Sequence, residues 1–256
     1  AKGTSLPSMM TIKYDRILHT NDPKPAHPKA RVGLPMALSF YEQMPFWHAF
    51  FNALGFETVR SEESDRNVYY KGQHTIASDT ICYPAKLTHG HIESLLEQKV
   101  DFIFYPCMSY NIDEGENDNH YNCPVVAYYP ELLKANNPKL NKQNFQFPYM
   151  DLNQPKNVAR VMQETLADYG ITRKQTKAAT EAAFAAQKQY REWVIAEGQR
   201  VIAQARAAGK PIIVLAGRPY HIDPEINHGI DHLITRHGAA VVTEDSISNR
   251  VEKFPT

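Results

Sequence analysis

The sequence predicts an α/β protein whose first domain is a Rossmann-like parallel sheet. Apolar runs of strand length alternate with helix-length amphipathic segments, which is the pattern of βαβ units. A helical segment with one long helix follows, and a second α/β domain then begins and is truncated by the end of the chain. We place these three parts at residues 31–150, 151–209 and 210–256. Residues 1–30 predict a linker or arm that holds at most a short element at 14–18.

The first βαβ pattern begins directly after the predicted linker. Residues 30–34 predict a short strand, and Pro45 suits the first turn of the helix that follows. That helix is rich in aromatic residues, and Gly55 is placed to end it. Residues 56–59 predict the second strand, so the parallel-sheet pattern is established early in the chain.

The chain has three cysteines, and each one borders a predicted element. Cys82 stands just before a helix that has Pro84 in its first turn. Residues 100–105 predict a strand covered on both faces, with Cys107 at its carboxyl end. Cys123 comes immediately before the next apolar run.

That next run, residues 124–129, predicts another strand, and a short helix is expected to begin at Glu131. If this strand were parallel to the one that ends before Cys107, Cys123 would start at the opposite edge of the sheet. The loop between the two cysteines is long enough to reach across, so the sequence leaves open whether Cys123 joins the other two.

Helices dominate the middle of the chain. Residues 157–169 predict an amphipathic helix that stops at Gly170. Residues 173–208 contain no proline and a single glycine, and they predict one very long helix, or two. An alanine-rich helix of this kind usually bridges domains or packs along a partner.

The second α/β pattern occupies the last part of the chain. Residues 211–216 predict a buried strand. Asp223 is a good N-cap for a helix that carries the apolar residues Ile226, Ile230, Leu233 and Ile234 and ends at Gly238. Residues 239–243 predict the next strand.

Composition excludes several classes of partner. Basic and acidic residues balance at 28 against 28 without a basic block, so we expect no nucleic-acid partner. No apolar run approaches the length of a membrane span, and we expect no membrane association. Few cysteines and no secretion signal predict a cytoplasmic protein.

The cysteines are the strongest chemical signal. A cysteine before a helix, such as Cys82, feels the positive end of the helix dipole, which favours a thiolate. Thiolates are the ligands of iron–sulfur clusters, and three of them leave one iron of a four-iron cluster open. The alternative is that the cysteines are small buried apolar residues, because their spacing matches no compact metal signature.

Histidines and one loop are weaker candidates. His89 and His91 lie two apart on a predicted helix and so do not share a face. His228 and His232 are spaced to bind a metal together or to lie on a helix surface.

Arg218, Tyr220 and His221 lie between a strand end and a helix start, where phosphates and carboxylates bind. The alternative is a capping loop in which Arg218 pairs with Glu244 or Asp245. Elsewhere the sequence lacks a P-loop, a Gly-x-Gly-x-x-Gly fingerprint and a nucleophile elbow, so it gives no support to those enzyme classes.

Several segments taken in order resemble the large acyl-CoA dehydratase activase-related proteins. These are relatives of the 2-hydroxyglutaryl-CoA dehydratase and benzoyl-CoA reductase superfamily. The segments that carry the resemblance are GLPMAL (33–38), PFWH (45–48), SDTICYPAKLTHGH (78–91), DFIFYPC (101–107), NCP (122–124), AGRPYH (216–221), NHG (227–229) and TEDS (243–246).

The resemblance implies a [4Fe-4S] cluster with Cys82, Cys107 and Cys123 as ligands. It also implies an ATP-dependent activase domain or protein as the electron donor, in a low-potential reductase or dehydratase system acting on acyl-CoA-like substrates. This chain lacks the ATPase segment of that family, so we expect a fragment of a longer protein that is inactive alone. Two alternatives are a non-catalytic interaction module and an anion-binding or CoA-binding domain, and a homo-oligomer stays open.

Overall fold

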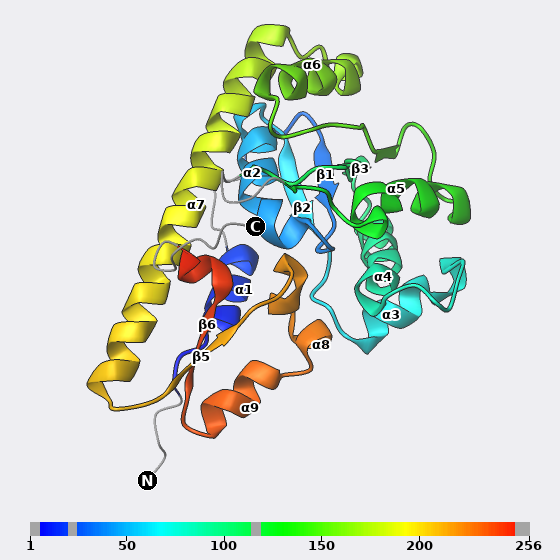
Figure 1. The fold of residues 1–256 in the computed structure, drawn as a ribbon. Coiled ribbons are helices and arrows are strands. Elements are labelled where there is room, and N and C mark those ends of the chain that lie inside the picture. Colours follow the sequence, from blue (N-terminus) through cyan, green and yellow to red (C-terminus); the bar gives the residue numbers. More distant parts are fainter. Residues whose placement is uncertain (1–5, 20–24, 114–118, 249–256) are drawn as a thin grey trace. The chain divides into compact units, whose positions relative to one another are not determined.

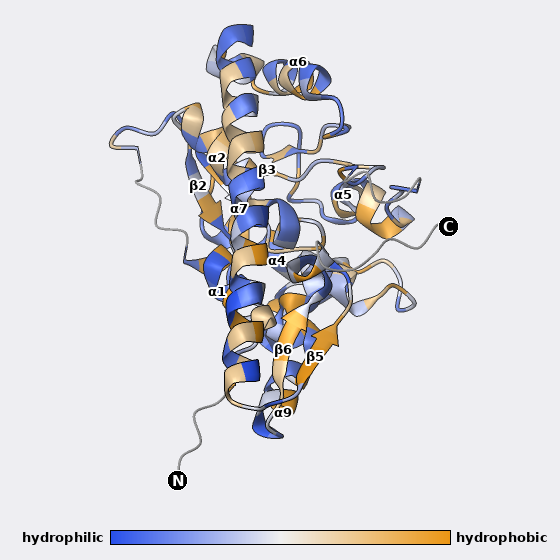
Figure 2. Cartoon of the chain, turned by 60° about the vertical axis from the view of Figure 1, so that its left-hand side comes forward, coloured by the Kyte–Doolittle hydropathy of each residue, from blue (hydrophilic) through white to orange (hydrophobic). Residues whose placement is uncertain are grey.

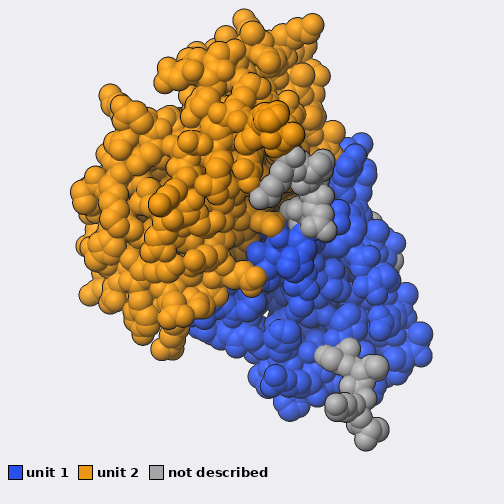
Figure 3. Space-filling view, turned by 180° about the vertical axis from the view of Figure 1, so that it is seen from behind, with its two compact units in different colours: residues 1–21, 187–255 blue, residues 22–186, 256 orange. Residues whose placement is uncertain are grey.

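The computed structural model describes residues 6–19, 25–113 and 119–248. The chain divides into two compact units, coloured separately in Figure 3. Unit 1 comprises residues 1–21 with 187–255, and unit 2 comprises residues 22–186 with 256. The long helix α7 (Arg173–Ala207) contributes residues to both units. The expected mixed α/β class is confirmed.

Unit 2 is built on a four-stranded sheet in which every strand pair is parallel. The strand order is β2-β1-β3-β4. The chain steps from β1 outward to β2, then crosses back over β1 to β3 and β4, so its direction reverses between β1 and β3. Ligands bind at such a switch point, beyond the carboxyl ends of the strands. The strands are β1 (Arg31–Leu34), β2 (Glu57–Arg60), β3 (Phe102–Phe104) and β4 (Phe145–Gln146).

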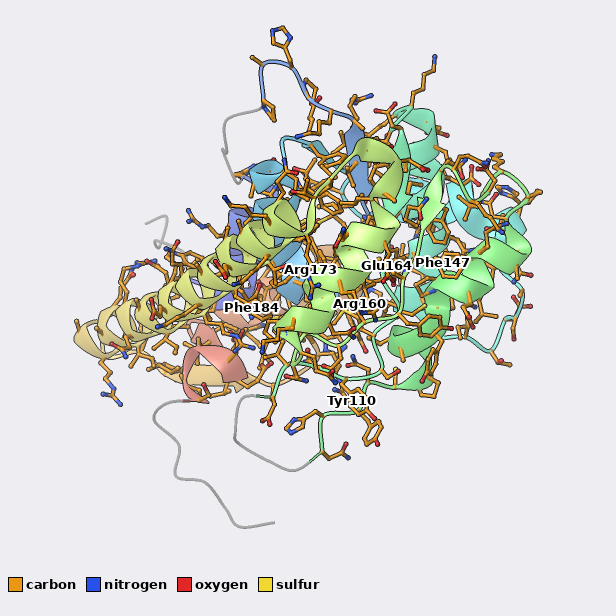
Figure 4. The ribbon with its side chains drawn as sticks, turned by 90° about the horizontal axis from the view of Figure 1, so that it is seen from above. Tyr110, Phe147, Arg160, Glu164, Arg173 and Phe184 are labelled. Carbon is orange, nitrogen blue, oxygen red and sulfur yellow. The ribbon has the colours of Figure 1, made fainter. Side chains whose placement is uncertain are left out.

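Helices cover both faces of this sheet. Helix α2 covers one face, and α4 and α5 cover the other, as Figure 1 shows. Right-handed crossovers produce this arrangement in a sheet of this strand order. The helices of unit 2 are α2 (Phe40–Ala53), α3 (Arg66–Gly72), α4 (Tyr83–Glu97), α5 (Pro124–Asn136), α6 (Pro155–Thr165) and the first half of α7, with short 3-10 turns at Gln73–Thr75 and Ala167–Tyr169. Figure 4 shows Arg160 and Glu164 beside one another on α6, where they form an ion pair at 2.7 Å.

Aromatic side chains fill the core between α2 and the sheet. Trp47 lies with its ring 4.7 Å from that of Phe104, and Phe46 meets Phe184 of α7 edge-on at 4.9 Å. The aromatic residues of α2 are fully buried. Each such side chain contributes about 1.5–3 kcal/mol through burial, so α2 is fixed firmly against β1 and β3.

The start of α2 differs from the sequence prediction. The helix begins at Phe40, and Pro45 lies inside it rather than in its first turn. The segment before it, residues 35–38, is buried, and Met36 N donates to Ser61 Oγ at 2.8 Å. This buried connection is short, so the helix begins five residues before Pro45. At the other end Gly55 follows the helix with φ 82°, as predicted.

The strand predicted for residues 124–129 is wrong, because this segment forms the first half of α5. The run of valines and tyrosines resembles a strand by composition. Burial nevertheless follows a helical period, with Ala127, Pro130 and Leu133 facing inward. The fourth strand of the sheet is instead the short β4, whose sequence carries no strong strand signal.

Helices α3 and α4 cross at two glycines. A Cβ added to Gly90 would lie 1.7 Å from Val68 O, and one added to Gly72 would lie 2.2 Å from Gly90 N. The backbones touch there, and no side chain fits between them. This crossing fixes α4 where its first turn meets the carboxyl edge of the sheet.

Unit 1 holds a two-stranded parallel sheet, β5 (Ile212–Leu215) with β6 (Ala240–Thr243). Figure 2 shows the apolar character of both strands. The other elements are α1 (Met9–Leu18), α8 (Pro224–Asn227), α9 (Ile230–Arg236), the second half of α7, and 3-10 turns at Pro219–Ile222 and Glu244–Ser246. Met9, Val201, Ala240 and Val242 belong to the core of the unit.

Within residues 1–30, where we expected a linker or arm with at most a short element at 14–18, residues 9–18 form the helix α1. Helix α1 is capped by Ser8, whose hydroxyl donates to Asp231 at 2.7 Å. Lys13 pairs with Asp245 at 2.5 Å, and Arg16 stacks over the Trp193 ring. Residues 1–5 and 20–24 of the expected linker lie outside the described part of the chain.

Two further expectations for unit 1 are wrong. The strand β5 is not buried, since Ile213 and Val214 are 39% and 45% exposed. The single helix expected after Asp223 is interrupted, because His228 and Gly229 adopt left-handed backbone at φ 56° and 69°. Helices α8 and α9 are the two short pieces that result. Within the described ranges, no helix is long and apolar enough to cross a membrane.

We predict that Gly90→Ala lowers the free energy of unfolding by about 1–3 kcal/mol, because the added methyl group meets Val68 backbone. An ordinary glycine-to-alanine change inside a helix raises stability by about 0.5–1 kcal/mol, so the sign is diagnostic. Urea unfolding measures it, and Gly72→Ala should behave in the same way. A gain in stability for either variant would contradict the packing at this crossing.

Candidate functional site

The carboxyl edge of the unit 2 sheet receives all three cysteines. Helices α4 and α5 both start at this edge and return the chain to the opposite edge, where β3 and β4 begin. Cys82 is the N-cap of α4, and Cys123 is the N-cap of α5. Cys107 lies three residues beyond β3. Because Cys123 precedes a helix and not a strand, it lies at the same edge as the other two.

The two capping cysteines have the same backbone geometry. Cys82 has φ −63° and ψ 150°, and Cys123 has φ −62° and ψ 152°. Both side chains are exposed. Cys123 Sγ accepts a hydrogen bond from Val126 N at 3.5 Å. Each of these two sulfurs therefore lies at the positive end of a helix dipole.

Cys107 lies in a different environment, because it is 1% exposed. Its N–H donates to Pro148 O at 2.9 Å, and its carbonyl accepts from Met150 N. Burial raises the pKa of its thiol to about 12, and the charge of Glu131 adds to the effect. Without a nearby cation Cys107 is therefore a thiol at neutral pH, and it becomes a thiolate only when a metal or another positive charge lies next to it.

Tyr105 places a hydroxyl group inside this site. The side chain is fully buried, and no hydrogen-bond partner for its Oη lies among the described residues. Burial raises the pKa of Tyr105, and Tyr129 and Cys107 raise it further, while Thr88 lowers it. These contributions place the hydroxyl near Thr88 of α4, Tyr129 of α5 and Cys107.

Tyr129 links this hydroxyl to Cys82. Burial raises the pKa of Tyr129, and the neighbouring Cys82 adds to it. The Tyr129 hydroxyl bonds His89 Nε2 at 2.8 Å, and His89 Nδ1 bonds Thr75 Oγ1 at 2.7 Å. Thr75 donates its own hydrogen to Gly72 O. Thr75 Oγ1 must then accept from His89 Nδ1, so His89 Nε2 accepts from Tyr129.

His89 and His91 are both buried on α4, and they have different partners. His91 bonds Ser61 at Nδ1 and Ser64 at Nε2. Burial lowers the pKa of His91 to about 3. Burial also lowers the pKa of His89 to about 4, with His74 adding to the effect. Both rings are neutral near pH 7, and they anchor α4 beneath the cysteine edge.

Single-ion metal sites are not formed in this part of the protein. Among the described residues, no three side chains of His, Cys, Asp or Glu are placed to hold one metal ion. A four-iron cluster keeps its cysteine sulfurs about 6–7 Å apart, farther than the ligands of a single ion. Cluster ligation by Cys82, Cys107 and Cys123 therefore stays a prediction.

The second predicted site, in unit 1, is a loop closed on itself. His221 Nδ1 accepts from Arg218 N at 2.9 Å, and its ring fills the space where a Cβ on Gly217 would lie. Tyr220 meets the His221 ring edge-on at 4.9 Å. Lys13 is the cation paired with Asp245. Anion binding by Arg218, Tyr220 and His221 stays a prediction.

The histidine pair predicted on one helix face does not form. His228 has left-handed backbone after α8, while His232 belongs to α9. The break between the two helices removes the i, i+4 relation on which a shared metal would depend. Of the acidic loop residues near the cysteines, 114–118 lie outside the described ranges.

Sequence reasoning missed the tyrosines of the cysteine edge. Tyr105 stands two residues before Cys107, and Tyr129 was assigned to a strand. The adjacent Tyr-Pro-Cys sequence at 105–107 is a usable signal, since a polar aromatic residue at a buried strand end needs a partner. The direction of its hydroxyl is visible only in three dimensions.

The architecture is that of an α/β protein in which two helix starts and one strand end lie at the same edge of a parallel sheet. The chain belongs to the family of the CoA enzyme activase uncharacterised domain (DUF2229), whose model matches residues 31–247. Neither a curated protein nor a solved structure matches the chain.

We predict that the stability of the metal-free protein falls as the pH drops from about 6.5 to 4. The folded pKa values of His89 and His91 lie below the ordinary 6.5, so the unfolded chain binds more protons in this window. Each histidine contributes a slope of about 1.4 kcal/mol per pH unit.

Urea unfolding at several pH values measures this slope. His89→Gln and His91→Gln should each be less stable at pH 7 and show a smaller slope, whereas the exposed His237→Gln should keep the wild-type slope. Equal slopes in all four proteins would mean that the two buried rings are not the cause.

Proposed function

We propose that this chain carries a [4Fe-4S] cluster on Cys82, Cys107 and Cys123. The cluster would serve as the redox centre of an ATP-dependent reductase or dehydratase system acting on acyl-CoA-like substrates. The single observation that carries the proposal is the common sheet edge of the three cysteines, two at helix starts and one at a strand end. Membership of a CoA enzyme activase family supports the same direction.

The residues suit such a group chemically. Cysteine thiolates are the usual ligands of a four-iron cluster, whose net charge is negative. The starts of α4 and α5 supply positive potential at Cys82 and Cys123. Cys107 is buried and holds its proton in the metal-free protein, so a cation at the site would stabilise its thiolate form. The buried Tyr105 hydroxyl, for which no partner lies among the described residues, adds a donor close to Cys107.

When bound, a cluster of this kind supplies one-electron transfer at low potential and leaves its fourth iron open to water or a substrate oxygen. The residues at the sheet edge would then hold the cluster and control access to it. Cys82 and Cys123 are on the exposed side, where a partner can approach. The buried Cys107 and the apolar ends of β1 and β3 keep water from the other side.

The partner implied by this role is an ATP-dependent activase domain or protein that delivers electrons. An acyl-CoA-like compound, or another small molecule that is hard to reduce, is the substrate class. The whole system would resemble the 2-hydroxyacyl-CoA dehydratases and benzoyl-CoA reductases, with this chain supplying the cluster.

Anaerobic reconstitution with iron and sulfide tests the proposal. We expect about four irons and four sulfides per chain and broad absorption near about 400 nm. Cys82→Ser, Cys107→Ser and Cys123→Ser should each lose most of the iron. Ser78→Ala, in the loop before Cys82, should load normally.

Thiol alkylation gives an independent readout. In the metal-free protein the exposed Cys82 and Cys123 should react and the buried Cys107 should not, and loading should protect both exposed thiols. A colourless protein whose Cys82 and Cys123 are alkylated equally fast before and after reconstitution would contradict the proposal that the chain carries a cluster. That outcome would favour the non-catalytic interaction module.

A further inference from the structure

The Tyr105 hydroxyl is a buried hydrogen-bond donor without an acceptor. Its side chain is 0% exposed, and no partner for Oη lies among the described residues. Leaving a buried donor unsatisfied is costly, and native structures seldom tolerate it. Such a group therefore points to a ligand atom or a water molecule that completes the site.

The neighbours of this hydroxyl come from all three cysteine-bearing segments. Thr88 belongs to α4, which Cys82 caps, and Tyr129 belongs to α5, which Cys123 caps. The third neighbour is Cys107 itself. The hydroxyl thus lies where the three segments face one another, on the inner side of the cysteine edge.

Among the described residues, no protein group around Tyr105 accepts a hydrogen bond from its hydroxyl in this arrangement. Thr88 donates its hydrogen to Pro84 O, and Tyr129 donates its own to His89. The oxygens of both residues retain lone pairs, but neither forms a well-aligned hydrogen bond with Tyr105 Oη, although the Thr88 hydroxyl is close enough to lower the pKa of Tyr105. A bound atom that accepts a hydrogen bond is what the site lacks, and beside Cys107 an anionic sulfur is the natural candidate.

We propose that Tyr105 Oη donates a hydrogen bond to an anionic sulfur of the cluster site, a bridging sulfide or the Cys107 thiolate. The inference rests on the proposed cluster. A hydrogen bond to sulfur stabilises the more negatively charged, reduced state and so raises the reduction potential. Tyr105 is then a positioning residue that sets how readily the cluster accepts an electron.

Tyr105→Phe tests this proposal, with Tyr41→Phe as the matched control. Tyr41 is buried close to the same sheet edge, but its hydroxyl donates to Met36 O at 3.1 Å and contacts Ser64. In the loaded full chain, an EPR-monitored redox titration should show a more negative midpoint potential for Tyr105→Phe and no shift for Tyr41→Phe. Iron should also pass to a chelator faster from the Tyr105→Phe protein.

The free energy of unfolding of the metal-free proteins gives a second readout, which reports the structural effect of each substitution without the cluster. Tyr105→Phe should be as stable as the wild type or more so, because it removes an unsatisfied donor. Tyr41→Phe should be less stable, because it breaks an existing hydrogen bond.

Two outcomes distinguish the inference from the function on which it rests. If the wild type loads a cluster and Tyr105→Phe keeps both its potential and its rate of iron loss, Tyr105 does not bond the cluster and only this inference is overturned. If the wild type takes up no iron and sulfide, the proposed function fails, and the inference fails with it.

Discussion

The parallel direction of all strands in the unit 2 sheet is the constraint from which the candidate site follows. Because the strands are parallel, every strand ends and every following helix starts at one edge of the sheet, and the hand of the crossovers decides which face each helix covers. Cys107 is at a strand end, while Cys82 and Cys123 cap the two helices on the same face. Residues far apart in sequence are thus collected without any short metal-binding motif. The Gly72–Gly90 crossing and the neutral His89 and His91 then fix α4 in place.

Some of the buried polar groups in the site have hydrogen-bond partners, and one has none among the described residues. The path from Tyr129 through His89 and Thr75 to Gly72 O is complete, so each donor in it has an acceptor. Tyr105 is outside that path, and no acceptor for its hydroxyl lies in the part of the chain that the structure describes. The satisfied hydrogen bonds of this path hold α4 and α5 in place. The Tyr105 hydroxyl is the remaining donor, and a ligand atom could accept its hydrogen bond. Burial also raises the pKa of the Cys107 thiol, so this group becomes charged only when a cation lies beside it.

Much of the fold follows from local signals. Proline predicted the start of α4 and glycine the end of α7, because capping and left-handed turns depend on nearby residues. The helix predicted over residues 157–169 ends earlier, at Thr165, and a 3-10 turn fills the rest of the segment before Gly170. The errors arose where packing decides. The apolar run after Cys123 has strand composition but packs with a helical period. Ile213 and Val214 of β5 and Ile230 and Leu233 of α9 are exposed rather than buried. The grouping of the cysteines at one edge depended on that single helix, so the sequence left it open. The surroundings of the Tyr105 hydroxyl could not be predicted from the sequence, because no sequence pattern shows which groups a buried side-chain oxygen meets.

The central claim is that three cysteines and Tyr105 surround one iron–sulfur group at the carboxyl edge of the sheet. Crystals of the anaerobically loaded chain, measured on both sides of the iron absorption edge, test it most directly. The account predicts one compact anomalous peak bonded to the sulfurs of Cys82, Cys107 and Cys123, with Tyr105 Oη facing it. Iron bound elsewhere on the chain, or iron held at this edge without Cys123, would contradict the account.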